Sequence, residues 1–164
     1  MNTKRIVTLG VLTGIALILF LVELRLPALS PIPGMKLGLA NIVTVYAVFR
    51  FRPQETVLLV TARILLGAVF CGSPSALIYS ACGAVCCLLG MLCLRHILPE
   101  QQIWLCSVIG AMLHNTGQIA AALFLMRSFA VIGYLPVLLV TGSAAGLLTG
   151  LTAQILVKRS RPVP

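Results

Sequence analysis

The sequence predicts an all-α fold: a polytopic membrane protein that forms a six-transmembrane-helix bundle with both termini cytoplasmic. Of its 164 residues, 60% are hydrophobic and only 9% are charged, and the mean hydropathy is +1.10. Soluble domains carry about 25% charged residues, so this composition argues against a soluble fold. A spanning helix needs about 20 apolar residues, and six spans with short loops would use nearly the whole chain. We therefore expect a single integral membrane domain over residues 1–164.

The first three apolar segments are separated by proline and arginine. Residues 6–22 follow a basic start, but no small-x-small cleavage site comes after them, so we expect a span rather than a signal peptide. Residues 23–35 are dense in proline, which is typical of a rigid loop. Residues 36–49 form a segment that is short for a span, and residues 55–70 form the third.

The last three apolar segments are longer. Pro74 is well placed to begin a helix over residues 75–94. A polar loop then leads to the fifth segment, residues 103–126. The sixth covers residues 131–157, and Pro136 is expected to interrupt it near its start.

The formal net charge of +9 is explained by membrane topology rather than by nucleic acid binding, because the charges lie between the apolar segments. A cytoplasmic N-terminus puts eight basic residues inside: Lys4, Arg5, Arg50, Arg52, Arg95, Lys158, Arg159 and Arg161. Three lie outside: Arg25, Lys36 and Arg127. This excess follows the positive-inside rule and predicts a multi-pass protein of the plasma membrane.

Two stripes of glycine recur at four-residue intervals. Gly142, Gly146 and Gly150 lie on the sixth segment, and Gly10 and Gly14 lie on the first. Such stripes allow close approach of helix backbones in lipid. Packing within the bundle explains them, and so does a docking face for another membrane protein; the sequence leaves both interpretations open.

Polar side chains inside the predicted spans mark a candidate binding site, because burying them in lipid is costly. They are Asn41, Arg63, His114, Asn115 and Gln118. At a rise of about 1.5 Å per residue, Arg63 and His114 fall near the midplane, and Gln118 lies about 6 Å further out. These groups from three helices share one level of the bilayer.

Arg63 has no acidic partner within any predicted span, and Glu23 lies just beyond the first one. Arg63 could bind backbone carbonyls and amide side chains as a structural residue. Alternatively, it forms a cationic pocket for an anionic or polar small-molecule ligand, which is the interpretation we favour. Lys36 belongs to the outer mouth of this substrate-binding site, where it either extends to the interface or attracts the ligand.

The residues that are absent restrict the chemistry. The chain has no Asp, no phosphate-binding loop, no GxSxG motif and no paired carboxylates. Diphosphate and ATP chemistry require acidic ligands for magnesium, so we expect no catalytic residues and no enzymatic activity. The six cysteines form no paired CxxC motif, so we expect neither a metal site nor a cofactor.

Five blocks of sequence resemble the bacterial Gx transporter family, which is also described as heptaprenyl diphosphate synthase component I. They are residues 32–44 (IPGMKLGLANIVT), 63–67 (RILLG), 80–83 (SACG), 114–118 (HNTGQ) and 134–138 (YLPVL). The blocks around Lys36 and His114 are the most specific, and the resemblance covers nearly the whole chain.

The resemblance implies two different functions. The transporter description places the family near the substrate-binding S components of energy-coupling factor importers of vitamins or their precursors, which work with a membrane coupling subunit and ATPases. In those proteins a stripe of small residues on the first helix docks the coupling subunit, and this chain has Gly10 and Gly14 there, where alanine is more usual. The synthase description implies an accessory subunit for prenyl diphosphate or menaquinone side-chain synthesis. A scaffold for a membrane redox complex is a third interpretation.

Overall fold

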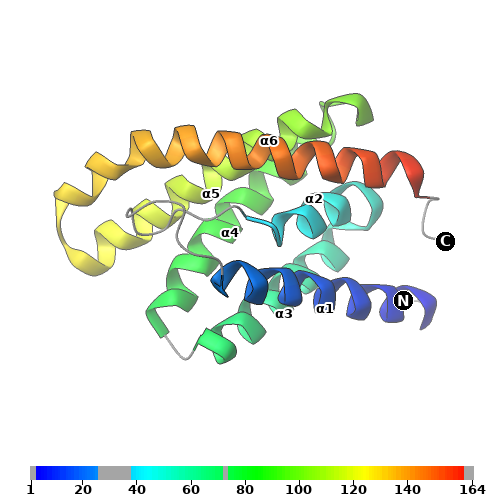
Figure 1. Cartoon of the computed structure of the whole chain (residues 1–164), viewed down its shortest axis with the longest axis horizontal. Helices are drawn as coiled ribbons and strands as arrows, with labels where there is room; N and C mark the ends of the chain where they lie inside the picture. Colours follow the sequence, from blue (N-terminus) through cyan, green and yellow to red (C-terminus); the bar gives the residue numbers. More distant parts are fainter. Residues whose placement is uncertain (1–2, 26–37, 72–73, 161–164) are drawn as a thin grey trace.

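A computed structural model describes residues 3–25, 38–71 and 74–160, and it is all-helical, as predicted. The described residues form six α-helices and two short 3₁₀ helices (Figure 1). Their bounds are α1 Thr3–Arg25, α2 Asn41–Arg50, α3 Pro53–Cys71, α4 Pro74–Leu94, η1 Glu100–Gln102, α5 Ile103–Met126, η2 Phe129–Tyr134 and α6 Leu135–Arg159.

Five of these helices are long and apolar enough to cross a membrane, so the chain is a multi-span membrane protein. The exception within the described part is α2, whose ten residues extend only about 15 Å against a hydrocarbon core of about 30 Å. The sequence had already indicated that this segment is short. Residues 26–37, which precede α2 and include most of the expected proline-rich loop, lie outside the described residues.

Helix boundaries follow the apolar segments closely. The fifth segment coincides with α5, and α4 begins at Pro74 as expected. The expected interruption near Pro136 is a change of helix type: η2 gives way to α6 at Leu135, and Pro136 occupies the first turn of α6. Proline is accepted there because the first turn of a helix needs no backbone donor.

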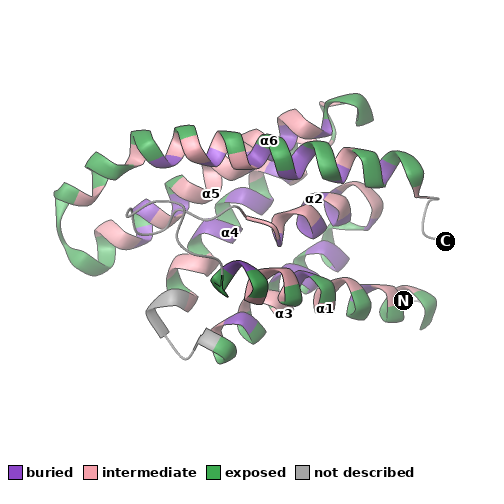
Figure 2. Cartoon of the chain, viewed as in Figure 1, coloured by how far each residue is buried: buried purple, intermediate pink, exposed green. Residues whose placement is uncertain are grey.

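The helices form two groups around the short α2. The α5 helix packs along both α4 and α6, and α1 packs mainly on α3 (Figure 1). The α2 helix contacts α1, α3, α4 and α6, and its Val45, Ala47 and Val48 are almost completely buried. The outer faces of the long helices are apolar and exposed, which suits contact with lipid (Figure 2).

The two glycine stripes have different surroundings. A methyl group on Gly146 would lie 2.9 Å from Val108 Cα, and one on Gly150 would lie 2.7 Å from Trp104 Cα, so this stripe packs against the α5 backbone. In contrast, nothing lies within 4 Å of such a group on Gly10 or Gly14. The α6 stripe therefore serves packing within the bundle, whereas the α1 stripe is left uncovered by the described part of this chain.

Candidate functional site

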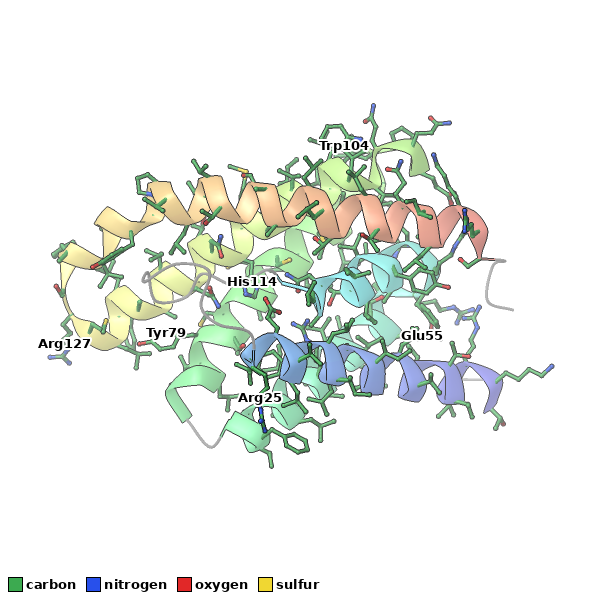
Figure 3. All side chains as sticks on the ribbon, viewed as in Figure 1. Arg25, Glu55, Tyr79, Trp104, His114 and Arg127 are labelled. Atoms are coloured by element: carbon green, nitrogen blue, oxygen red, sulfur yellow. The ribbon has the colours of Figure 1, made fainter. Side chains whose placement is uncertain are left out.

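A cavity of about 640 Å³ lies inside the bundle, and all six α-helices contribute to its lining. Cavities that hold small molecules typically have volumes of about 300–1,000 Å³. The lining is mostly apolar, with a belt of polar side chains across it: Glu23, Asn41, Arg63, His114, Asn115 and Gln118. Figure 3 shows the labelled His114 near the middle of the bundle.

Five of the six residues predicted to bind substrate line this cavity: Asn41, Arg63, His114, Asn115 and Gln118. They come from α2, α3 and α5, which the apolar pattern placed at a common depth. The sixth residue, Lys36, lies outside the described residues. The structure thus brings the predicted intramembrane residues together, while their role in binding stays a prediction.

Arg63 is held at the cavity wall by its neighbour on α2. Its Nη1 donates to Asn41 Oδ1 at 3.4 Å, which links the middle of α3 to the first residue of α2. Gly38 lies three residues before Asn41 and has a φ of +70°, a conformation that glycine adopts at little cost. A methyl group there would also lie 3.2 Å from Asn41 Nδ2, so Gly38 makes room for the amide that meets Arg63.

Glu23 is the functional candidate that the sequence did not place in the site. The α1 helix continues to Arg25, so Glu23 lies inside it, is only 9% exposed and lines the same cavity. Its two carboxylate oxygens accept hydrogen bonds from the backbone N–H groups of Gly38, at 2.5 Å, and Leu39, at 3.2 Å. The sequence placed Glu23 at the start of the loop after the first span, whereas the structure places it within α1, where it adds a carboxylate to the cavity lining that also contains Arg63.

His114 and Gln118 of α5 pack against α4 at Gly83. A methyl group on Gly83 would lie 2.9 Å from both His114 Cε1 and Gln118 Cγ. One on Gly117 would lie 2.7 Å from the Cys82 carbonyl oxygen. The close contact of α4 and α5 at these glycines leaves the imidazole and the amide at the cavity wall.

Asn115 faces the opposite neighbour, α6. Its Nδ2 donates to the carbonyl oxygen of Leu138 at 2.6 Å, and a methyl group on Gly142 would collide with this same nitrogen. One glycine of the α6 stripe thus gives space to a polar group of the cavity as well as allowing close helix packing.

Hydroxyl groups extend the polar lining beyond what the sequence indicated. Tyr79 and Ser80 of α4 line the cavity, and so do Ser107 and Thr149, whose side-chain oxygens are 3.2 Å apart. Serine and threonine are common packing residues in membrane helices, so only their position in the fold distinguishes these. Among the described residues, no three His, Cys or Glu side chains are arranged to hold a metal ion.

The bundle and its cavity define a class: a polytopic membrane protein with an internal space the size of a small molecule. The chain belongs to the heptaprenyl diphosphate synthase component I family, whose model matches residues 12–156. A search of curated proteins and a search of solved structures found no match.

Proposed function

We propose that this protein is the substrate-binding membrane subunit, similar to an S component, of an energy-coupled importer for a small molecule such as a vitamin precursor. One observation carries the proposal: Arg63 lines the same cavity of about 640 Å³ as Asn41, His114, Asn115 and Gln118. A guanidinium in lipid is retained where something satisfies it. Asn41 accepts one hydrogen bond from Arg63, and an anionic or polar ligand would accept others in a two-point contact.

Arg63 can bind an anion even though the Glu23 carboxylate lines the same cavity. Glu23 directs both of its oxygens to the backbone N–H groups of Gly38 and Leu39, so its carboxylate already has hydrogen-bond partners within the chain. The guanidinium carries five donors, and the Asn41 bond uses one of them. A carboxylate or phosphate in the cavity would find remaining donors on Arg63, with His114 and Gln118 to orient it.

Retention of ligand by the purified protein tests this function. Native mass spectrometry of the wild-type protein should detect a bound small molecule, and Arg63→Met should lose it. Arg63→Lys keeps the charge but not the planar fork, so it should weaken retention at least about tenfold, or about 1.4 kcal/mol. Equal retention by wild type and both variants would mean that Arg63 is structural and the proposed site is wrong.

Coupling to a partner is tested separately on α1. The importer would need a membrane coupling subunit and ATPases, and the uncovered Gly10 and Gly14 give a face on which α1 can approach another helix. Gly10→Leu combined with Gly14→Leu should leave the monomer folded, because these positions are open, while preventing co-purification with the coupling subunit. Unfolding of the double variant would instead indicate packing within the bundle.

The alternative function is an accessory subunit of prenyl diphosphate or menaquinone side-chain synthesis, and the family description favours it. We propose that in either case the chain itself is not the catalyst, since it has no Asp to hold magnesium. The isolated protein with Mg²⁺ should therefore show neither ATPase nor prenyl transferase activity. Co-purification with a prenyl synthase rather than with ATPases would favour the accessory role.

A further inference from the structure

The cavity is elongated, and its two ends differ. Along α5 its lining runs from Ser107 to Met126, a distance of about 28 Å at the rise of an α-helix. At the end near the N-terminus of α5, Ser107, Thr149 and Met91 are 3%, 4% and 1% exposed, so this end is closed. At the end near the C-terminus of α5, Met126 also lines the cavity but is 63% exposed. Among the described residues, this second end is therefore open.

The rim of the open end is apolar. Tyr134 of η2 lines the cavity and is 50% exposed, and the nearby Phe124 and Phe129 are strongly exposed. These residues lie around the tip of the hairpin formed by α5, η2 and α6, where the labelled Arg127 is also found (Figure 3). Exposed aromatic and apolar side chains are typical of a surface that contacts the lipid interface.

Polarity changes along the cavity in a corresponding way. The polar belt at Arg63 and His114 lies about 18 Å from Met126 along α5, counted from His114. Between them the described lining includes the apolar side chains of Ile119 and Ala122, and the hydroxyl groups of Tyr79 and Ser80 are the polar groups nearest to this stretch on α4. A ligand with only a polar head would leave this stretch without an apolar partner.

From this arrangement we infer that the ligand is a single-chain amphiphile, with an anionic head at Arg63 and an apolar tail that runs past Ala122 to the rim at Tyr134. The inference rests on the proposed function and adds the chemical class of its substrate. The head meets the only belt of polar groups in the described lining that contains a cation, and the tail meets apolar side chains. Entry would take place from the membrane interface, where both parts of such a molecule already reside.

Two probes that share a head group test the inference on the full chain in phosphatidylcholine nanodiscs, with empty discs correcting for partition into lipid. Ethyl phosphate supplies the head alone, and octyl phosphate adds six methylenes. Each buried methylene strengthens binding by about fourfold at most, so octyl phosphate should bind at least about a hundredfold more tightly. Equal affinities for the two probes would overturn the inference.

A pair of variants on α5 locates the tail. Ala122 lines the cavity, whereas Ala120 lies on the same helix and is exposed outside it. Ala122→Phe should weaken the binding of octyl phosphate at least about tenfold and leave the affinity for ethyl phosphate within about twofold of wild type. The retained binding of ethyl phosphate also shows that the variant is folded. Ala120→Phe should change neither affinity. An Ala122→Phe variant that binds octyl phosphate as tightly as wild type would place the tail elsewhere and contradict the inference.

Failure of the inference can be distinguished from failure of the proposed function. If ethyl phosphate binds and Arg63→Met abolishes this binding, but the octyl tail adds nothing, the site stands and the amphiphile is wrong. If Arg63→Met changes the affinity of neither probe, the proposed site itself is wrong. Repeating the titration in phosphatidylglycerol discs tests for competition by a membrane lipid. Unchanged binding of octyl phosphate supports a free single-chain amphiphile, whereas loss of that binding assigns the cavity to a two-chain lipid and contradicts the inference.

Discussion

At the scale of single residues, Arg63 and Glu23 place opposite charges on the lining of the same cavity. Each charge would be costly in the membrane interior, and each has neutral partners as well: Asn41 for Arg63, and the Gly38 and Leu39 N–H groups for Glu23. Removing one charge therefore leaves the other with hydrogen bonds but without a counter-charge. Stability should respond more strongly to losing one than to losing both.

A double-mutant cycle measures this coupling. Arg63→Met and Glu23→Gln should each lower the thermal stability of the purified protein. The double variant should recover part of the loss, with a coupling free energy of about 0.5–3 kcal/mol. Melting of the four proteins in the same detergent gives the result. Additive losses would show that the two charges do not interact, and Arg63 would then depend on Asn41 and the ligand alone.

At the scale of helices, the same glycine spacing has opposite consequences on α1 and α6. Gly150 meets the α5 backbone at Trp104 Cα, where no flexible atom can move aside. Gly150→Ala should therefore lower the free energy of unfolding by about 1–3 kcal/mol through overpacking. Gly10 faces open space, so Gly10→Ala should be neutral or stabilise the helix by up to about 1 kcal/mol.

Chemical or thermal unfolding of the two alanine variants beside wild type checks this contrast. The pair is matched in residue type and in position within a helix, so intrinsic helix propensity cancels from the comparison. Equal stabilities would mean that α6 can shift away from α5 at little cost, and that the α6 stripe does not set their separation.

The short α2 depends on arginines at its C-terminal end. Arg95 Nη1 donates to the carbonyl oxygens of Val48 at 2.9 Å and Phe51 at 3.3 Å, which α2 leaves without helical partners. Arg50 in turn donates to the carbonyl oxygens of Val157 and Ser160 at the end of α6. These bonds fasten a helix that is too short to span the membrane, while its first residue holds Arg63 at the cavity.

Arg50→Gln should lower stability by about 1–3 kcal/mol, because charge-assisted hydrogen bonds to carbonyls are among the stronger ones. The ion pair between Arg50 and Glu100, at 3.6 Å, contributes little to stability because the Glu100 side chain is 59% exposed. Arg52→Gln, two residues away and exposed, is the matched control and should stay within about 0.5 kcal/mol of wild type. Equal effects of the two substitutions on the melting temperature would contradict a fastening role for Arg50.

For the molecule as a whole, apolar length predicts the fold well and the site in part. The bounds of α5 follow directly from an apolar run between polar turns, and the depth of Arg63 and His114 follows from counting residues along such runs. Glu23 could not be placed in this way, because a glutamate at the edge of an apolar run can lie in water or turn inward. Only the packing of α1 against α2 and α3 decides it. Spacing likewise cannot tell Gly10 from Gly146, since the neighbouring helix determines the role of each.

The direction in which the bundle crosses the membrane stays a prediction from charge. The structure gathers basic residues at one end: Arg5 bonds Glu55 at the start of α3, and Arg50 and Arg95 bond the ends of α6 and α2. Arg127 lies far from the labelled Glu55, at the other end of the bundle (Figure 3). By the positive-inside rule the end with most basic residues is cytoplasmic, so α1 should begin and α6 should end inside.

Single cysteines in a cysteine-free background test this orientation. The two positions are Ser128, in the exposed turn between α5 and η2, and Ser160, which follows the end of α6. Each would be replaced by cysteine, as Ser128→Cys and Ser160→Cys. A membrane-impermeant maleimide added to intact cells should label position 128 and not position 160, and both should react after permeabilisation, which controls for accessibility. Labelling of position 160 alone in intact cells would invert the protein in the membrane. The rim of the cavity at Tyr134 would then face the cytoplasm, and uptake from outside would be excluded as its function.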